Sequence, residues 1–238
     1  VEGHAFMTGI QALVRLPLDR KRLDRGAGYN TAGFISGYRG SPLGGYDQQL
    51  RAVQPLLDSH DIKFWEGLNE DLGATAVWGS QQLGLFPGAR YDGLFGIWYG
   101  KAPGVDRTGD VFKHANAAGT SALGGVLAIV GDAHNCKSST LPSQSEFAMA
   151  DAEIPVLNPA SIQDVLDYGI HGWNMSRYSG AWTGLVALAD TMDSGAVVNI
   201  DLDRFNFVAP SFHLPEAGVH MRRGDTPLDK EARLRHFK

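Results

Sequence analysis

The sequence predicts an α/β fold in which a mostly parallel sheet lies between two layers of helices, a three-layer sandwich. Short apolar runs alternate with longer amphipathic stretches, which is the pattern of βαβ units. Glycine contributes 30 of the 238 residues, well above the usual ~7%, and gathers where strands end and helices begin. The run "GGVLAIVGD" (Gly124–Asp132) is almost uniformly apolar, as expected of a strand covered on both faces.

The first half of the chain predicts two strands and three helices. Proline breaks or bends a helix, and glycine closes it, so the helical segments can be bounded from these residues. In order, we expect a helix over Gly9–Gly28 bent at Pro17, a strand over Thr31–Tyr38, a helix over Gly44–Asp61 that contains Pro55, a short strand over Ile62–Gly67, and a helix from Asn69 to about Leu85.

The second half continues the alternation. Ser161 is the expected N-cap of a long helix, and Asp164 three residues later completes a pair like a capping box. The expected elements are a strand over Tyr91–Gly100, a helix near Asp106–Ala118, the strand Gly124–Asp132, a helix over Ser145–Glu153, a strand over Ile154–Pro159, the helix Ser161–Ser179, and final strands over Thr183–Leu188 and Ala196–Leu202.

The chain divides near Phe205. Beyond it the sequence is rich in proline, histidine and arginine, and "PLDKEARLRHFK" resembles the start of a new element. We therefore expect one α/β domain over 1–205, and a linker or the start of a following domain over 206–238, so that the chain is a fragment of a longer protein.

Composition excludes several classes. The net charge of -5 and the absence of a basic stripe argue against nucleic acid as a partner, and the segment Arg15–Arg25, interrupted by aspartates, is interpreted as a solvated helix face. A single cysteine, Cys136, allows no internal disulfide and no iron–sulfur cluster held by four of the chain's own cysteines. No apolar run approaches the roughly 18 residues of a membrane span, and no signal peptide is visible, so we expect a cytoplasmic protein without a membrane partner.

A candidate site follows from the turns after the strands. The first strand leads into "GYRGSPLGGYD", the second is followed by Glu70 and Asp71, and the third by Gly100 and Lys101. The carboxyl ends of parallel strands meet at one edge of the sheet, where ligands bind. The glycine spacing fits neither a dinucleotide fingerprint nor a P-loop. The sequence therefore lacks the motif that a nicotinamide-dependent enzyme would carry here. The structural alternative is that Asn69 caps a helix whose dipole the two carboxylates complement, and we favour that interpretation for Asp71.

The loop "GDAHNCKSST" after the fourth strand places Asp132, His134 and Cys136 at alternate positions. Three mixed ligands in a row without a second cluster make a weak metal site, so no metal ligands are predicted in this chain. The five tryptophans are spread along predicted strands and helices, where core packing is the ordinary role.

Four segments carry a family resemblance: "NTAGFISGYRGSPLGGYDQ", "NEDLGATAVWGSQQ", "GKAPGVDRTGDVFKHANAAGT" and "CKSSTLPSQSEFAMADAEIPVLNP". Together they resemble the amino-terminal region of indolepyruvate ferredoxin oxidoreductase, in its long fused bacterial form. The resemblance runs from about Phe6 to Lys238. It implies the pyrimidine-binding domain of a thiamine-diphosphate enzyme of the 2-oxoacid:ferredoxin oxidoreductase superfamily. Where that family reads Gly-Asp-Asp-His, this chain has Ala133 after Asp132 and departs again at Asn135 and Cys136, so any role of the second aspartate is in doubt.

The resemblance also implies residue roles. Glu70 falls where the superfamily places the glutamate that hydrogen-bonds the pyrimidine ring nitrogen, and a carboxylate suits a shared proton across one short hydrogen bond. Ser41 stands where relatives that act on pyruvate carry a threonine, so it would face the 2-oxoacid, although starting the next helix is an equal alternative. The candidate residues are, for the cofactor, Glu70, Gly40, Gly100 and Lys101, and, for the substrate, Ser41, Arg39 and Lys137. For Arg39 a surface position is the favoured alternative, and for the loop of Lys101 a solvated loop is an equal one.

The whole enzyme implied by the resemblance decarboxylates arylpyruvates oxidatively, with coenzyme A as co-substrate and ferredoxin as electron acceptor. The chain has neither a Gly-Asp-Gly motif followed by paired asparagines nor a Cys-x-x-Cys pair. We therefore expect other domains or a companion subunit to hold the magnesium ion, the cofactor diphosphate and the 4Fe–4S clusters. The superfamily suggests that the assembly is a homodimer. We expect the isolated chain to be inactive. The alternative is a non-catalytic scaffold or dimerisation domain derived from the same fold.

Overall fold

The structure is a computed structural model that describes residues 3–135, 141–216 and 218–237, and it confirms the predicted α/β class. In the part of the chain that it describes, six strands form the main sheet in the order β3-β2-β4-β5-β7-β6, and every neighbouring pair is parallel. The strands are β1 His4–Thr8, β2 Thr31–Gly37, β3 Ile62–Phe64, β4 Gly93–Lys101, β5 Val126–Asp132, β6 Val156–Leu157, β7 Thr183–Leu188 and β8 Gly195–Asn199.

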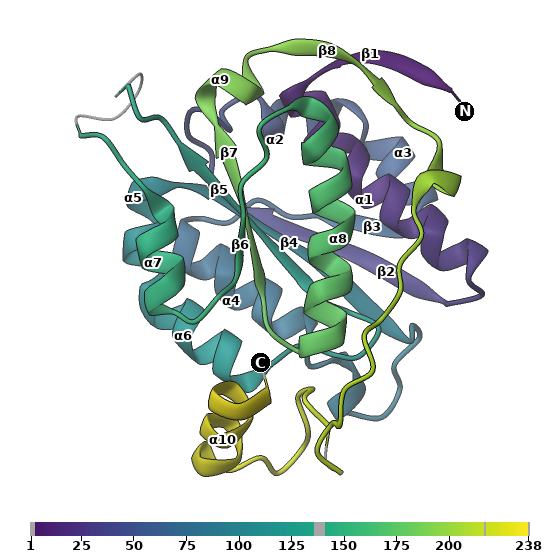
Figure 1. The fold of residues 1–238 in the computed structure, drawn as a ribbon, viewed down its shortest axis with the longest axis vertical. Coiled ribbons are helices and arrows are strands. Elements are labelled where there is room, and N and C mark those ends of the chain that lie inside the picture. Colours follow the sequence, from purple (N-terminus) through teal and green to yellow (C-terminus); the bar gives the residue numbers. More distant parts are fainter. Residues whose placement is uncertain (1–2, 136–140, 217, 238) are drawn as a thin grey trace.

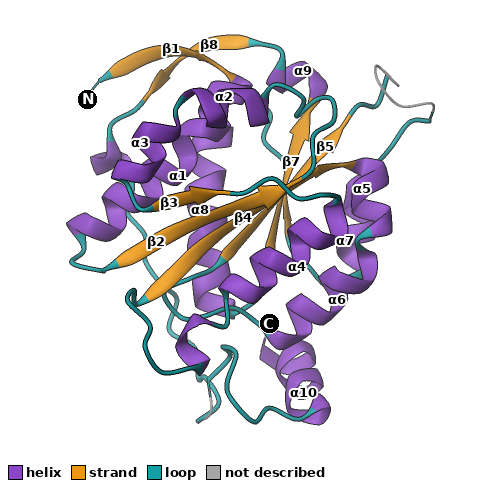
Figure 2. Cartoon of the chain, turned by 180° about the vertical axis from the view of Figure 1, so that it is seen from behind, coloured by secondary structure: helices purple, strands orange, loops and turns teal. Residues whose placement is uncertain are grey.

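Helices cover both faces of the sheet (Figures 1 and 2). One apolar core lies between the sheet and α1, α2, α3 and α8, and a second lies between the sheet and α4, α5, α6 and α7. The helices are α1 Gly9–Gly26, α2 Tyr46–Ala52, α3 Gln54–Ser59, α4 Glu70–Ser80, α5 Ala102–Arg107, α6 Gly109–Ala118, α7 Ser145–Asp151, α8 Ile162–Ser179, α9 Ala189–Met192 and α10 Pro227–Phe237.

The helix ends follow local sequence rules. Thr8 and Gln11 form a capping box at the start of α1, and Pro17 is accommodated inside that helix. The side chain of Ser161 caps α8 by accepting from the amide of Asp164, 3.1 Å away, as predicted. The Asp164 carboxylate reaches back to the amide of Ala160 at 3.1 Å, one residue earlier than in a regular capping box.

Three helix predictions are corrected at their boundaries. The helix expected over Gly44–Asp61 is divided at Val53 into α2 and α3, with Pro55 in the first turn of α3, where its missing amide hydrogen costs nothing. The helix expected from Asn69 to Leu85 ends at Ser80, and a separate 3-10 turn covers Leu83–Leu85. The helix expected near Asp106 begins earlier and is broken into α5 and α6 at Thr108, whose hydroxyl bonds the Asp71 carboxylate at 3.1 Å. α10 packs against α6, while the division of the chain near residue 205 stays a prediction.

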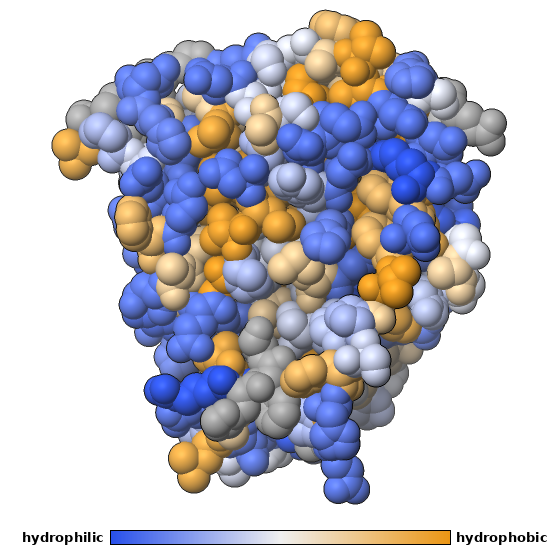
Figure 3. All heavy atoms as spheres, in the orientation of Figure 1, coloured by the Kyte–Doolittle hydropathy of each residue, from blue (hydrophilic) through white to orange (hydrophobic). Residues whose placement is uncertain are grey.

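The last predicted strand does not join the main sheet. β8 pairs antiparallel with β1, a strand that the sequence analysis missed, and the two form a separate ribbon (Figure 1). Met7 and Val198 on its inner face are buried, whereas Phe6 and Val197, which are cross-strand partners, are 70% and 67% exposed. Figure 3 shows apolar surface where this ribbon lies. Each strand buries only one residue deeply, too weak a pattern to predict β1.

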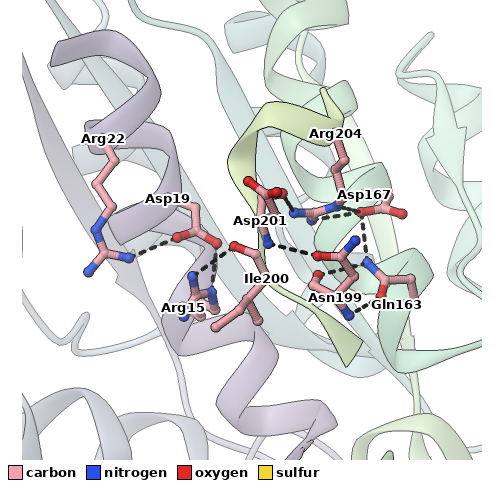
Figure 4. Close-up of polar contacts among 9 residues, drawn as sticks. All are labelled: Arg15, Asp19, Arg22, Gln163, Asp167, Asn199, Ile200, Asp201 and Arg204. Carbon is pink, nitrogen blue, oxygen red and sulfur yellow. Dashed lines mark hydrogen bonds and ion pairs between the residues drawn. The ribbon is translucent and has the colours of Figure 1, made fainter. Parts of the chain in front are cut away.

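The segment that leaves β8 is fastened to α1 and α8 (Figure 4). Asn199 exchanges hydrogen bonds with Gln163 of α8, at 2.8 and 3.3 Å. Arg204 donates to the Asp167 carboxylate of α8, at 2.8 and 3.0 Å. Arg15 of α1 donates to the carbonyl of Ile200 at 3.4 Å. These contacts fix the course of the chain beyond the ribbon.

The interpretation of Arg15–Arg25 as a solvated helix face is wrong. Arg20, Lys21 and Asp24 are buried, because α1 is covered by the sheet on one side and by α8 on another. Their charges are paired inside the protein, with Arg177 of α8 donating two hydrogen bonds of 2.7 Å to Asp24. Within the described residues, no helix is long and apolar enough to cross a membrane.

Candidate active site

The carboxyl ends of β2 and β4 lie side by side, with Gly37 opposite Tyr99. The chain leaves β2 toward α2 on one face of the sheet and leaves β4 toward α5 on the other. Ligands of open α/β sheets bind at such a point, where neighbouring strands send their connections to opposite faces. This edge is therefore the candidate site.

The glycine-rich turn after β2 closes over the ends of two other strands. The amide of Tyr38 donates to the carbonyl of Tyr99 at 3.0 Å, which continues the β2–β4 pairing. A side chain at Gly40 would meet the stem of Lys101, since its Cβ would lie 2.7 Å from Lys101 Cδ. One residue beyond Ser41, Pro42 packs on Gly131 of β5. The turn thus brings Gly40 and Ser41 to the ends of β4 and β5.

Glu70 lies in the first turn of α4 and is only 6% exposed. Its backbone carbonyl accepts from the indole nitrogen of Trp98 at 3.0 Å. A Cβ at Gly104 would stand 2.4 Å from Glu70 Cγ and 2.6 Å from Oε1, and one at Gly100 would stand 3.4 Å from Cγ. Because Gly100 of β4 and Gly104 of α5 carry no side chains, there is room for the Glu70 carboxylate between them.

Arg107, half-exposed at the end of α5, faces both adjacent carboxylates. Its guanidinium lies 3.7 Å from Glu70 Oε2 and 3.3 Å from Asp71 Oδ2. Asp71 also accepts from the hydroxyl of Thr108 at 3.1 Å. Asp71 therefore does more than complement the helix dipole, because it ties α4 to the junction of α5 and α6.

Asp47 is a buried carboxylate that the sequence analysis missed. It lies in the first turn of α2, 4% exposed, beside the fully buried hydroxyl of Tyr99. Burial raises the pKa of Asp47; the nearby Glu66 raises it further, whereas Tyr99, Arg51 and Arg39 oppose the shift. Its Oδ1 atom has no hydrogen-bond partner among the described residues. Only the high polarity of the turn around it hinted at such a group.

Asp132, at the end of β5, is fully buried and serves α7. Its carboxylate accepts from the amide and the hydroxyl of Ser145, at 2.8 and 2.7 Å. Burial raises the pKa of Asp132, although the Ser145 bonds oppose this. In the described chain, no group of three or more histidine, cysteine, aspartate or glutamate side chains is placed to hold a metal ion.

The structure brings most of the predicted site residues to this edge. Gly40, Ser41, Glu70, Gly100 and Lys101 lie at the carboxyl ends of β2 and β4 or in the turns that follow them. Arg39 lies on the same turn and is exposed. Lys137 lies outside the described residues. Gly104 and Arg107 were not singled out as partners of Glu70, because their closeness depends on how α5 folds back.

Core packing was predicted for the five tryptophans. It is confirmed for Trp98, Trp173 and Trp182, which are fully buried. Trp98 and Trp182 both meet Phe112 edge to face, with ring centroids 4.7 and 5.9 Å apart. Trp65 is half-exposed instead, at the edge next to β3.

No protein-family model matches the sequence, and no curated protein matches it. Among solved structures, the chain is similar to the 2-oxoglutarate:ferredoxin oxidoreductase from Magnetococcus marinus, which was solved with 2-oxoglutarate, coenzyme A and succinyl-CoA bound. The TM-score is 0.67 at 14% identity, over 87% of this chain and 33% of that chain. The chain thus spans about a third of the length of the protein it resembles, and the likeness shows a shared fold.

Proposed function

We propose that this chain is the pyrimidine-binding domain of a thiamine-diphosphate-dependent 2-oxoacid:ferredoxin oxidoreductase that acts on arylpyruvates, with indolepyruvate foremost. The fold shared with a 2-oxoglutarate:ferredoxin oxidoreductase supports the class of enzyme. The sequence segments around Ser41, Glu70 and Lys101 support the arylpyruvate substrate, since they are the segments that resemble the indolepyruvate enzymes.

One observation carries the proposal: Glu70 is a buried carboxylate at the ligand-binding edge of a parallel sheet, and two glycines leave the space that its side chain occupies. A carboxylate that only complemented the helix dipole would need no such enclosure, since that interaction is made equally well at the surface of a helix end. A buried carboxylate with few hydrogen-bond donors is suited to share a proton with a ligand.

The residues present fit the pyrimidine half of the cofactor. Glu70 would hold the pyrimidine ring nitrogen, and Gly40 and Gly100 would let the ring approach the backbone. Lys101, whose stem lies against Gly40, would contribute positive charge beside it. Thiamine diphosphate, when bound, supplies the electron sink for loss of carbon dioxide from a 2-oxoacid. The sequence lacks a Gly-Asp-Gly motif followed by paired asparagines, so the magnesium ion and the diphosphate would be held by another domain or subunit.

Substrate binding would fall to the turn after β2. The hydroxyl of Ser41 can donate a hydrogen bond to the 2-oxoacid, and the exposed guanidinium of Arg39 can pair with its carboxylate. Lys137 remains a candidate from the sequence. Ferredoxin, coenzyme A and 4Fe–4S clusters would engage the remainder of a longer polypeptide or a companion subunit, in a homodimeric assembly of the cytoplasm.

The test compares two neighbouring carboxylates in the complete polypeptide that contains this chain. Anaerobic reduction of ferredoxin with indolepyruvate and coenzyme A measures turnover, and calorimetry measures thiamine-diphosphate affinity. Glu70→Gln removes the shared proton and should lower turnover by about 10²–10⁴-fold. Asp71→Asn, the matched control, removes one charge from the same helix turn and should leave at least a third of the activity.

Turnover by Glu70→Gln within about a factor of two of the wild type would contradict the assignment of this residue. A wild-type polypeptide that binds no thiamine diphosphate and turns over no 2-oxoacid would favour the non-catalytic scaffold instead. The isolated chain is expected to be inactive, because only the pyrimidine half of a site is present in it.

A further inference from the structure

Asp47 lies directly behind the turn that is proposed to bind the substrate. Two hydrogen bonds fold this turn tightly, one from the amide of Leu43 to the carbonyl of Gly40 at 2.7 Å and one from the amide of Tyr46 to the carbonyl of Leu43 at 3.0 Å. Asp47 follows at once, in the first turn of α2, and is 4% exposed. Only these two tight turns of chain separate its buried carboxyl group from Ser41.

Both ends of the turn lie against Tyr99 of β4. The amide of Tyr38 donates to the carbonyl of Tyr99 at 3.0 Å, and the ring of Tyr46 meets that of Tyr99 edge to face, with centroids 5.1 Å apart. Asp47 lies beside the hydroxyl of Tyr99 but outside full hydrogen-bond geometry, so that this hydroxyl and the Oδ1 atom of Asp47 are both buried without a partner among the described residues. Buried polar atoms without partners cost stability, so two of them behind a ligand site call for a role.

Other charged and titratable groups surround Asp47 from several elements. They are the phenols of Tyr46 and Tyr99, the carboxylate of Glu66 after β3, and the guanidinium groups of Arg51 on α2 and Arg39 on the turn. Arg51 lies one helical turn beyond Asp47, yet it forms an ion pair with Glu66. Arg39 is exposed and is the group that would meet the substrate carboxylate. The charge of Asp47 and the charge of a bound anion would therefore act on the same guanidinium.

We propose that Asp47 takes up a proton when the carboxylate of a 2-oxoacid binds at Arg39 and Ser41, so that protonation and substrate binding strengthen each other. This inference rests on the proposed function. A bound carboxylate brings a second negative charge to the turn and neutralises the guanidinium of Arg39, and both changes disfavour the ionised form of Asp47. Burial already raises the pKa of Asp47, so the further rise on binding falls nearer to neutral pH than it would for an exposed aspartate. Linkage then requires that the protonated form bind the anion more tightly, by the same factor.

Proton uptake is measured in the complete polypeptide with indole-3-lactate, which carries a hydroxyl in place of the keto group of indolepyruvate and is not decarboxylated. Calorimetric titrations at one pH, in buffers of different ionisation heat, give the number of protons taken up per bound anion. If the two forms of Asp47 differ about tenfold in affinity, the wild type takes up about half a proton at the pH of maximum uptake. Asp47→Asn should lose this uptake and, above that pH, bind the anion about tenfold more tightly than the wild type.

Two further variants should shift the pH of maximum uptake in opposite directions. Tyr99→Phe removes the hydroxyl that favours ionised Asp47, so the maximum should move to higher pH. Glu66→Gln removes a negative charge that disfavours it, so the maximum should move to lower pH. Glu66 is the other carboxylate of this cluster, and its variant is therefore also the matched control. Uptake that persists in Asp47→Asn and disappears in Glu66→Gln would overturn the proposal.

Kinetics separate this role from a merely structural one. Above the pH of maximum uptake, Asp47→Asn should lower KM for indolepyruvate several-fold and leave kcat within about a factor of two. A fall in kcat with KM unchanged, or a wild type that binds indole-3-lactate without taking up a proton, would overturn the inference and leave the proposed function standing. A wild type that neither binds the analogue nor turns over a 2-oxoacid would overturn the proposed function, and this inference with it.

Discussion

Two buried carboxylates, Asp24 at the amino edge of the main sheet and Asp47 at its carboxyl edge, have opposite surroundings. At the amino edge, Asp24 is fully buried and accepts from Arg20, Thr31 and Arg177, with four bonds of 2.6 to 2.7 Å. At the carboxyl edge, Asp47 is almost as buried, yet its Oδ1 has no hydrogen-bond partner in the described chain.

The difference appears in the proton affinities. Burial opposes ionisation of Asp24, but the donors from Arg177, Arg20 and Thr31 together lower its pKa. For Asp47 burial prevails and raises the pKa. A carboxylate supplied with donors stabilises the fold, whereas one left short of donors costs stability and stays available for a ligand or a proton. The contrast holds between these two carboxylates and not for every carboxylate of either edge, since Asp132, buried at the carboxyl edge, accepts two hydrogen bonds from Ser145.

The largest expected effect is on stability, at the amino edge. Asp24→Ala leaves two buried arginines without their shared partner, which typically costs about 3–5 kcal/mol. Urea unfolding of the wild-type chain and the variant measures the difference. Asp203→Ala, at an exposed aspartate, is the control and should change the free energy of unfolding by less than about 0.5 kcal/mol. A loss below about 1 kcal/mol for Asp24→Ala would remove the distinction between the two carboxylates.

At the carboxyl edge we expect a loss of activity with little loss of stability. In Gly104→Ala the new methyl group would overlap the Glu70 side chain, which must move aside. Turnover of the complete polypeptide should fall about a hundredfold, since displacement of a catalytic group by about 1 Å has that effect. Gly109→Ala, in the next helix with open space around its Cα, is the matched control and should keep full activity. Equal activities would mean that the enclosure of Glu70 has no functional role.

The smallest expected effect has the opposite sign. Asp47→Asn removes a buried charge whose Oδ1 atom has no hydrogen-bond partner among the described residues, and should stabilise the chain by about 1 kcal/mol at pH 7, which raises Tm by about 2–4 °C. Because the folded-state pKa of Asp47 is raised, its cost is absent below about pH 4 and appears as the pH rises through the folded-state value. The variant and the wild type should therefore unfold alike near pH 4 and diverge toward neutrality.

The same titration sharpens the comparison at Asp24. Its folded-state pKa is lowered, so its contribution is complete above about pH 4 and is lost as the pH falls through the folded-state value. Thermal unfolding of the wild type and both variants between pH 3 and pH 8, followed by circular dichroism, measures both trends. A stability gain in Asp47→Asn that is constant with pH would show that charge is not its cause.

The sequence predicted the main sheet well because both of its faces are buried. A run such as Val126–Asp132 is almost entirely apolar and fits only a strand that is covered on both faces. The helices between the strands carry recognisable caps at Ser161 and Asn69. Of the β1–β8 ribbon, β8 was predicted as a strand, whereas β1 and its pairing with β8 were missed, because β1 buries only one residue deeply. The basic helix segment was misjudged for another reason. Charges on α1 are paired with Arg177, more than 150 positions away, and no local pattern reports such a partner.

The candidate site was predictable to the level of its strand ends. Topology alone places Gly40, Glu70 and Lys101 at one edge, because every parallel strand ends there. What lies within 4 Å of Glu70 was not predictable, since it depends on the break between α5 and α6 at Thr108. The burial of Asp47 depends likewise on side-chain packing across different elements, because its neighbour Tyr99 belongs to β4.

The β1–β8 ribbon has a consequence for the order of events during synthesis. His4 pairs with Asn199, so their positions differ by 195. At ~5–20 residues per second, the ribosome makes the second strand roughly 10–40 s after the first. β1 therefore waits, unpaired and carrying an apolar side chain at Phe6, until the segment that contains β8 has emerged. Among the strand pairings of the described residues, this one has the longest loop to close.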